Sequence, residues 1–323
     1  MKAVILRNAD GTFTKAVEDV PAPDGAGGAV LNVRYSSLNY KDALALTNRA
    51  PIVRKWPMIP GIDAAGSVAS NPDANVPPGA LAVVTGWGLG ETRLGGFGER
   101  AEVEPKWLTP LANGFSPWDA MAIGTAGLTA MLCVMAIERH GTLPADGPVL
   151  VTGASGGVGG MALMLLKRLG YQTIASTGRL TEADYLRRLG ASDVVDRNEL
   201  SRPGKPLQSE RWAAAIDSVG SVTLANVCAS TRYGGVVAAC GLAQGMELPA
   251  TVAPFILRGV CLAGIDSVMA APPLRAAAWA RLDDLADRRL LREVAREISL
   301  AETFDAAEEL LAGRVRGRLV VRI

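Results

Sequence analysis

The stretch VTGASGGVGG at residues 151–160 decides the fold of the middle of this chain. A short apolar run leads into it and an apolar run with helical character follows it. Gly153, Gly156 and Gly159 stand where a dinucleotide-binding loop needs a tight turn, room for a pyrophosphate and close packing of helix on strand. Backbone N–H groups at the start of such a helix face the phosphates. The stretch therefore predicts a nucleotide-binding βαβ unit.

The end of the next predicted strand indicates which nucleotide is bound. An NAD site usually carries Asp or Glu there, for the ribose hydroxyls. This chain has Ser176-Thr177-Gly178-Arg179 instead. A carboxylate would repel a 2′-phosphate, whereas Arg179 can bind one through two hydrogen bonds. We therefore expect NADPH as the cofactor; the alternative for Arg179 is a solvated surface arginine.

Strand and helix patterns divide the chain near residue 120. Short β-type runs separated by Gly and Pro come first, at residues 1–6, 29–35, 64–69, 80–87 and 99–104. From Val149 strands alternate with helices expected at 157–169, 181–189 and 221–230, which predicts a parallel sheet covered on both faces. A loop at 201–209, a helical tail at 274–311 and a last strand at 318–323 follow.

Composition excludes several classes of function. With 33 Lys and Arg against 32 Asp and Glu, the 323-residue chain has no basic surface signal for nucleic acid or an anionic membrane. The uncharged stretch 120–137 is long enough to span a bilayer but weakly apolar, so we expect a buried helix in a soluble protein. The four cysteines lack C-x-x-C spacing and are expected to be buried thiols in a reducing cytoplasm. A single histidine, His140, excludes His-ligated zinc sites and Ser-His-Asp catalysis.

The letters T-G-x-x-x-G-x-G also occur in short-chain dehydrogenases, which place this loop near the N-terminus and use a Tyr-x-x-x-Lys pair. None of the five tyrosines has Lys four residues later, so this class is rejected. A β-rich first half followed by a central nucleotide-binding domain resembles instead the medium-chain dehydrogenase/reductase superfamily. Zinc members of it carry G-H-E, where this chain has Gly61-Ile62-Asp63 with Ile62 in place of the histidine ligand. The chain therefore resembles the zinc-free, quinone-oxidoreductase-like branch, and we expect no metal.

Strings along the whole chain, among them SSLNYKDALALT (36–47), TGWGLGE (85–91) and GTAGLTAMLCVMA (124–136), look like the NADPH-dependent acryloyl-CoA reductases. The resemblance implies an α/β protein with a GroES-like β-rich catalytic domain at 1–121 and 262–323. A Rossmann NADP-binding domain with a doubly wound parallel sheet is implied at 122–261. The implied activity is reduction of the C=C bond of a short 2-enoyl-CoA, acryloyl-CoA to propionyl-CoA, by a cytoplasmic homodimer.

The resemblance also implies candidate catalytic residues. In this superfamily an Asn-x-x-Asp stretch faces the nicotinamide, and Asn39 to Asp42 matches it. Tyr40 is the candidate proton donor or enolate hydrogen bond, because a phenol is neutral and can donate at pH 7; packing under the cofactor is the alternative. Asn39 can bond the cofactor or the thioester, or form a turn. We expect Asp42 to orient the backbone or Lys41 rather than to abstract a proton.

The G-x-Tyr-Pro stretch of some enoyl-thioester reductases is replaced by Asn48-Arg49-Ala50-Pro51, so water is a second candidate proton source. Arg318 resembles a C-terminal residue that contacts the cofactor in the family, and a lone surface arginine is the alternative. Arg49, Arg54, Lys55 and Arg93 are candidate partners of the CoA phosphates, with solvated surface positions favoured. The expected cofactor-binding residues are Ala43, Gly153, Ser155, Gly156, Val158, Gly159, Gly160, Ser176, Gly178, Arg179, Ser221, Gly245, Gly259, Ala270 and Arg318.

Three functions remain open from the sequence. The first is the enoyl-CoA reductase. The second is an NADPH:quinone oxidoreductase, which shares the fold and the cofactor. The third is a non-catalytic NADPH-binding protein, which an undamaged cofactor loop disfavours. We rank them in that order.

Overall fold

The computed structural model describes residues 1–73, 75–111 and 114–323, which divide into two compact units. The β-rich unit comprises Met1–Thr125, Val268–Asp283 and Arg288–Ile323. The parallel-sheet unit comprises Ala126–Ser267 and Asp284–Asp287. Compactness alone does not make either unit an independent domain, so the expected domain assignment stays a prediction.

The β-rich unit is built on a seven-stranded sheet in the order β14-β15-β3-β4-β5-β7, with β6 paired to β3, and on the separate antiparallel hairpin β1-β2. Apart from β14 with β15, the strands of the large sheet pair antiparallel. The strands are β1 (Lys2–Ala9), β2 (Thr12–Asp19), β3 (Ala29–Leu38), β4 (Asp63–Ser70), β5 (Leu81–Thr85), β6 (Arg100–Val103), β7 (Thr109–Pro110), β14 (Ala295–Ser299) and β15 (Arg318–Arg322). Its helices are α1 (Tyr40–Thr47), α7 (Pro272–Leu285), α8 (Arg288–Val294) and α9 (Thr303–Leu311).

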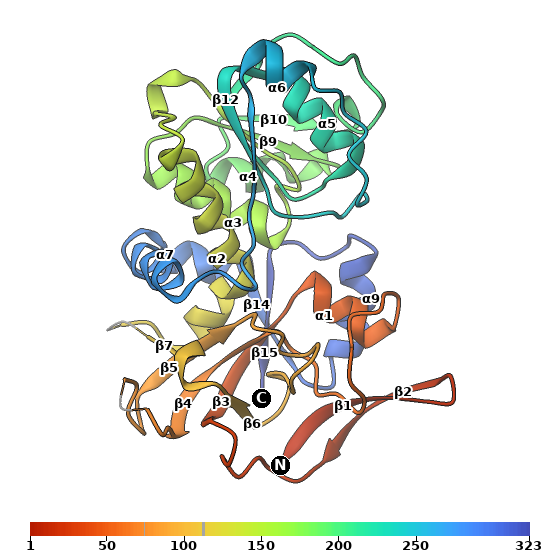
Figure 1. The fold of residues 1–323 in the computed structure, drawn as a ribbon, viewed down its shortest axis with the longest axis vertical. Coiled ribbons are helices and arrows are strands. Elements are labelled where there is room, and N and C mark those ends of the chain that lie inside the picture. Colours follow the sequence, from red (N-terminus) through yellow and green to blue (C-terminus); the bar gives the residue numbers. More distant parts are fainter. Residues whose placement is uncertain (74, 112–113) are drawn as a thin grey trace. The chain divides into compact units, whose positions relative to one another are not determined.

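The core of the β-rich unit explains where α1 lies. Buried apolar residues of β1, α1, α9 and β15 form one cluster, and α1 packs directly on α9 (Figure 1). Leu46 and Ala43 of α1 are fully buried in that cluster. Burial of one side of α1 in this cluster therefore holds the helix, which begins at Tyr40, in place.

The expected helical tail at 274–311 is wrong in its middle. The structure interrupts it with β14, which pairs in parallel with β15 from Ala295 to Ser299. The ladder of backbone hydrogen bonds outweighs the helix propensity of this Ala-, Arg- and Glu-rich segment. Strand β2 and helix α1 were also not predicted. The β-type runs expected at 1–6, 29–35, 64–69, 80–87 and 99–104 all contain strands.

The parallel-sheet unit confirms the expected doubly wound sheet. Its six strands pair in parallel in the order β10-β9-β8-β11-β12-β13, so the order reverses between β8 and β11. Helix α3 packs on β8 and β9, and α5 and α6 pack on β12 (Figure 1). The elements are β8 (Val149–Val151), α3 (Gly157–Arg168), β9 (Thr173–Thr177), α4 (Ala183–Leu189), β10 (Asp193–Asp196), β11 (Trp212–Asp217), α5 (Ser221–Ser230), β12 (Thr231–Ala239), α6 (Ala253–Arg258) and β13 (Cys261–Gly264).

Helix α2 (Pro117–Arg139) contains the uncharged stretch and crosses the boundary between the units. It is long and apolar enough to span a membrane, but 83% of its most apolar window is buried inside the protein. The expected buried helix is therefore confirmed. The helix is kinked at Gly124, whose φ of 51° and ψ of −158° lie outside the helical region.

The cysteines depart in part from expectation. All four are free thiols, and Cys133 and Cys228 are buried as expected. Cys240 is half-buried and Cys261 is exposed. Cys261 begins β13, which forms one edge of the parallel sheet. An edge position leaves part of a strand open to solvent, which explains its exposure.

Candidate active site and nucleotide site

The glycine loop between β8 and α3 has the conformation that its sequence predicts. Gly153 has φ +59°, which makes the turn out of the strand. Gly156 caps the start of α3 in an extended conformation, and its backbone is exposed. A Cβ on Gly159 would lie 2.5 Å from the carbonyl oxygen of Gly153 and 2.6 Å from the Cα of Ala154. The turn and the close packing are confirmed, and contact with a phosphate stays a prediction.

The loops that follow β8 and β11 are tied together where the strand order reverses. Thr152 Oγ1 donates to Asp217 Oδ1 at 2.7 Å, and it accepts from the N–H of Ser218 at 3.1 Å. Asp217 Oδ2 accepts from the N–H of Gly220 at 2.7 Å. Burial raises the pKa of Asp217, although these hydrogen bonds oppose the shift. This reversal point is where doubly wound sheets bind nucleotides.

Two further expected neighbours of the cofactor meet at this edge. Ser221 begins α5 with φ +50°, a strained value for a residue with a side chain. Gly220 forms a β-bridge with Gly245, and a Cβ on Gly245 would lie 3.5 Å from Ser221 Oγ. The structure therefore brings Ser221 and Gly245 together, from loops that follow β11 and β12.

The other expected neighbours are more dispersed. Val158 and Gly160 lie in the first turn of α3, and Gly160 is buried there. Gly259 ends α6 in the left-handed region, with φ +59°. Ala43 and Ala270 belong to the β-rich unit and are 0% and 7% exposed. A cofactor contact of any of these residues stays a prediction.

The end of β9 is organised around two hydroxyls. Ser155 Oγ and Thr177 Oγ1 lie 2.9 Å apart, and Thr177 Oγ1 accepts from the N–H of Arg179 at 3.1 Å. The side chain of Ser176 is buried, and its carbonyl accepts from the N–H of Ala154 at 3.2 Å. These bonds join the glycine loop to the segment in which the sequence predicts the 2′-phosphate.

The Arg179 side chain has an acidic neighbour that the sequence reasoning missed. Its Nε lies 3.2 Å from Glu182 Oε2, three residues along the chain. Arg179 is therefore half-buried and ion-paired, and its contact with a 2′-phosphate stays a prediction. A bound phosphate would share this guanidinium with Glu182.

Arg197 is a second arginine at this position that the sequence reasoning missed. A Cβ on Gly178 would lie 2.5 Å from Arg197 Nε, so the guanidinium lies over that glycine. No carboxylate of the described residues is within ion-pair distance of Arg197. The signal was available, because Arg197 directly follows β10 and parallel neighbours such as β9 and β10 end at the same edge.

The residues at this edge fit an NADP-type dinucleotide. Gly156 leaves its backbone exposed at the start of α3, while Gly153 and Gly159 allow the tight turn and the close packing behind it. Arg179 and Arg197 supply the donors that a 2′-phosphate takes. The carboxylate of Glu182 is compensated by its ion pair with Arg179.

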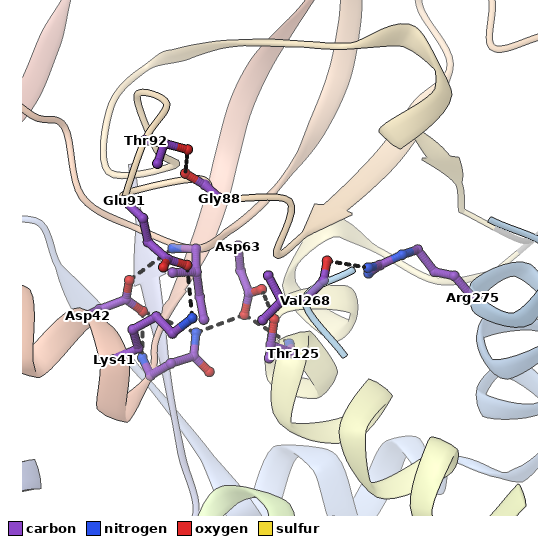
Figure 2. Close-up of polar contacts among 11 residues, drawn as sticks. Lys41, Asp42, Asp63, Gly88, Glu91, Thr92, Thr125, Val268 and Arg275 are labelled. Atoms are coloured by element: carbon purple, nitrogen blue, oxygen red, sulfur yellow. Dashed lines mark hydrogen bonds and ion pairs between the residues drawn. The ribbon is translucent and has the colours of Figure 1, made fainter. Parts of the chain in front are cut away.

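The β-rich unit contains a cluster of buried polar side chains, which we call the Asp63 cluster; Figure 2 labels three of its members, Asp42, Asp63 and Thr125. Asp63 is fully buried at the start of β4. Its Oδ2 accepts from Ser37 Oγ at 2.5 Å, Asn39 Nδ2 at 2.9 Å and the N–H of Thr125 at 2.9 Å. Its Oδ1 accepts from Thr125 Oγ1 at 2.5 Å. The cluster comprises Ser37, Asn39, Asp42, Asp63, Thr125 and Arg318.

Arg318 is buried in this cluster and not at the surface, so the alternative of a lone surface arginine is wrong. Its guanidinium donates to Asn39 Oδ1 at 3.1 Å and to the carbonyls of Ala122 at 3.1 Å and Met121 at 3.4 Å. Burial lowers its pKa, while the charge of Asp63 opposes the shift. Contact with a cofactor stays a prediction for this residue.

Asn39 and Asp42 shape the start of α1. Asn39 is the N-cap residue and is 8% exposed, so the expected turn role is confirmed. Asp42 accepts from the N–H groups of Asn39 and Ile62, each at 2.9 Å, which confirms that it orients the backbone. The alternative that it orients Lys41 is wrong: Lys41 Nζ lies 2.9 Å from Glu91 Oε1 (Figure 2).

The pKa of Asp42 is raised to about 7, which nothing in the sequence suggests. Complete burial is the main cause, and the negative charge of Asp63 adds to it. The two backbone N–H donors and Asn39 Nδ2 oppose the shift. A carboxylate that titrates near neutral pH therefore lies two residues from the candidate proton donor.

Tyr40 is the first residue of α1 and is 45% exposed. Its side chain follows directly on the turn that Asn39 and Asp42 hold, and it is exposed to solvent.

Among the candidate CoA partners, Arg49 is ion-paired with Glu308 and Arg93 with Glu104. Arg54 and Lys55 are exposed.

Across the described ranges 1–73, 75–111 and 114–323, no three His, Cys, Asp or Glu side chains are grouped so as to hold a metal ion. Ile62, in place of the histidine ligand, is 4% exposed. Asp63, the next residue, is the centre of the hydrogen-bonded cluster.

Comparison with known proteins identifies the family. A family model described as zinc-binding dehydrogenase matches residues 157–284. Over 326 residues, covering both chains completely, the chain is 47% identical to the probable acrylyl-CoA reductase AcuI of Escherichia coli. It is also 47% identical over 298 residues to the acrylyl-CoA reductase AcuI of Ruegeria pomeroyi, covering 92% of this chain and 90% of that one. The structure of the yhdH oxidoreductase from Salmonella enterica in complex with NADP matches with a TM-score of 0.97 and 49% identity over both whole chains.

The chain therefore belongs to the medium-chain dehydrogenase/reductase superfamily, whose members include the zinc-binding dehydrogenases. Within it, the chain falls in the branch of the acrylyl-CoA reductases, which confirms the resemblance found in the sequence.

Proposed function

We propose that this protein is an NADPH-dependent acryloyl-CoA reductase that converts acryloyl-CoA to propionyl-CoA. The observation that carries the proposal is the 47% identity to acrylyl-CoA reductases over the full length of the chain. The arginine pair at the end of β9 and β10 supports NADPH over NADH, because a 2′-phosphate takes both guanidinium groups as partners. NADP is also the ligand of the Salmonella structure.

The glycine loop would bind the pyrophosphate through backbone N–H groups of residues 157–159, since those of Gly156 and Gly160 donate to the carbonyls of Gly153 and Gly156. Arg179 and Arg197 would bind the 2′-phosphate. Ser155, Ser176, Gly178, Ser221, Gly245, Gly259, Ala43, Ala270 and Arg318 are the remaining proposed neighbours. When bound, NADPH supplies the hydride that adds to the β-carbon of the substrate. The protein positions the two partners and excludes water from them.

The side chains of the Asn39–Tyr40 turn would act on the thioester. A thioester carbonyl conjugated to a C=C bond makes the β-carbon electrophilic, and negative charge then develops on the carbonyl oxygen. The Tyr40 phenol would donate a hydrogen bond to that oxygen or a proton to the α-carbon. The side chain of Asn39 is hydrogen-bonded to Asp63 and Arg318, so we propose that it holds Tyr40 in place and does not bind the substrate.

Oxidation of NADPH by purified protein tests the proposal, with acryloyl-CoA, crotonyl-CoA and a benzoquinone as acceptors and NADH as the control. We expect turnover on acryloyl-CoA with NADPH. Turnover on the quinone alone would contradict the thioester assignment and leave an NADPH:quinone oxidoreductase. NADPH binding without turnover on any acceptor would identify a non-catalytic NADPH-binding protein. Tyr40→Phe is expected to lower kcat roughly 10²–10⁴-fold if Tyr40 transfers the proton.

We also propose that the enzyme is a cytoplasmic homodimer, with a GroES-like catalytic domain at 1–121 and 262–323 and an NADP-binding domain at 122–261. The edge strand β13 and an exposed apolar group at the preceding helix α6 support the dimer. Val252, Ile256 and Leu257 are 65%, 72% and 63% exposed, around helix α6. Light scattering should give twice the chain mass, and Ile256→Asp should give the monomer. A monomeric wild type would contradict this assignment.

A further inference from the structure

Asp63 of β4 joins two segments that are far from it in sequence. Ser37, near the end of β3, and Asn39, just before α1, belong to the first, and Thr125, which follows the kink of α2 at Gly124, belongs to the second. All three donate to one carboxylate that has no exposed surface. Hydrogen bonds to a charged acceptor are stronger than those between neutral groups. The carboxylate therefore fixes the position of the Asn39–Tyr40 turn more firmly than a neutral residue of the same shape would.

The space around the carboxylate is filled. A Cβ on Gly124 would lie 2.7 Å from Asp63 Oδ2, 2.6 Å from Arg318 Nη2 and 2.9 Å from Ser37 Oγ. Asp42, the neighbouring carboxylate, already accepts from the N–H groups of Asn39 and Ile62 and from Asn39 Nδ2 at 3.2 Å. Loss of the Asp63 charge would therefore leave Ser37 Oγ and Thr125 with a neutral acceptor and Asn39 Nδ2 with only the longer bond to Asp42 as a charged one.

We propose that Asp63 is a positioning residue for the reduction: its carboxylate holds the turn that presents the Tyr40 phenol to the thioester. This rests on the proposed function, since Tyr40 is the candidate donor of that reaction. Asp63 is fully buried and acts through Asn39, to which it is bonded directly. Arg318 bonds the other end of the same amide and supplies the balancing charge. A small displacement of an acid or base from its working position lowers turnover without preventing cofactor binding.

Two adjacent serines provide a matched test. Ser36 and Ser37 are both fully buried in β3 and both donate to Asp63. Ser36 Oγ donates to the backbone carbonyl at 2.6 Å, whereas Ser37 Oγ donates to the carboxylate at 2.5 Å and accepts from Asn39 Nδ2 at 3.2 Å. Ser36→Ala and Ser37→Ala therefore each remove one buried hydroxyl. Of the two, only Ser37→Ala removes hydrogen bonds to the Asp63 carboxylate and to Asn39.

We expect Ser37→Ala to lower kcat on acryloyl-CoA roughly 10-fold and to leave the KM for NADPH within about twofold. Ser36→Ala should keep kcat within about twofold of wild type, although both variants should lose similar thermal stability. Equal kcat values in the two variants would overturn the proposal, because a purely structural role affects both alike.

Asp63→Asn is the second variant, since it keeps the shape and removes the charge. It should lower kcat by about 100-fold while the Kd for NADPH, measured by fluorescence, stays within about threefold. A folded Asp63→Asn protein with wild-type kcat would contradict the proposal. An equal loss of NADPH affinity and of kcat would also contradict it.

Wild-type turnover is measured first, so that failure of the proposed function is seen separately. If the wild type reduces no acceptor, hydrogen exchange of the amides of residues 39–43 replaces kcat as the readout. Faster exchange in Ser37→Ala than in Ser36→Ala would then support the role of the carboxylate. Equal exchange in both variants would overturn it.

Discussion

The glycine loop of the parallel-sheet unit and the Asp63 cluster of the β-rich unit are built in opposite ways. The loop takes its function from ten consecutive residues, 151–160, in which backbone conformation matters and side chains would obstruct. The cluster takes its residues from β3, α1, β4, α2 and β15, and its side chains make the contacts. We assign affinity for the cofactor to the first region and the geometry of turnover to the second.

This difference teaches which features can be found from sequence. A nucleotide loop is local, so spacing alone indicates it. A buried polar cluster depends on tertiary contacts, such as the one between Asn39 and Arg318, which are 279 residues apart. The two regions should therefore respond to different perturbations, and the predictions below separate them in order of decreasing effect.

The largest effect is expected from pH acting on the Asp63 cluster through Asp42. The pKa of Asp42 is raised from 3.8 to about 7 in the folded protein, so the folded state binds this proton more tightly than the unfolded state. The resulting stabilisation is complete below pH 4 and is lost as the pH rises through about 7. This group alone should lower the free energy of unfolding by up to about 4 kcal/mol between pH 4 and pH 8.

Urea unfolding of wild type and Asp42→Asn at pH 4 and pH 8 checks this prediction. Titration of all other groups is common to both proteins, so the difference between them isolates Asp42. The stability of wild type relative to Asp42→Asn should fall from pH 4 to pH 8. A difference that is constant, or that grows with pH, would contradict the raised pKa.

The glycine loop should be sensitive to a single methyl group. In Gly159→Ala the new Cβ would meet Gly153 and Ala154 backbone atoms at 2.5–2.9 Å. Overpacking of this kind costs up to about 3 kcal/mol, so NADPH affinity should fall roughly 100-fold. In the adjacent Gly160→Ala the Cβ would meet Leu189 Cδ1 at 3.3 Å and the Ala154 carbonyl oxygen at 3.9 Å, so the loss measured by NADPH fluorescence should be much smaller. Equal losses would contradict the packing argument.

The arginine pair should determine the preference for NADPH. Arg179→Ala and Arg197→Ala each remove a charged donor to the 2′-phosphate, so each should weaken NADPH binding roughly 10-fold. NADH lacks that phosphate, and its affinity should change little. Titration of both nucleotides by fluorescence checks this. A parallel loss of NADH affinity would mean that the arginines act through the fold of the loop.

The smallest effect is expected at Glu182, which shares Arg179 with the phosphate. Glu182→Gln removes the competing carboxylate, an ion pair at 3.2 Å that is half-exposed on the arginine side. Such pairs contribute up to about 1 kcal/mol, so NADPH should bind about threefold more tightly. Weaker binding would show instead that Glu182 holds Arg179 in its working position.

Much of the parallel-sheet unit could be predicted from sequence, because apolar runs and glycine spacing are local signals. Arg197 was missed because its role follows from the alignment of β9 with β10 and not from a motif. The raised pKa of Asp42 was missed because it depends on complete burial beside Asp63. Strand β14 was missed because pairing with β15 overrides a local composition that favours helix.

The central claim is that the nucleotide site determines cofactor affinity and the Asp63 cluster determines the rate of turnover. Its most direct test is the single-turnover rate of NADPH oxidation by acryloyl-CoA at increasing NADPH concentration, measured for Arg179→Ala and Ser37→Ala. The account predicts that Arg179→Ala reaches the wild-type rate once NADPH saturates. It predicts that Ser37→Ala saturates at the wild-type concentration of NADPH but at a rate about tenfold lower. Recovery of Ser37→Ala at high NADPH, or a permanently slow Arg179→Ala, would contradict the division between affinity and turnover.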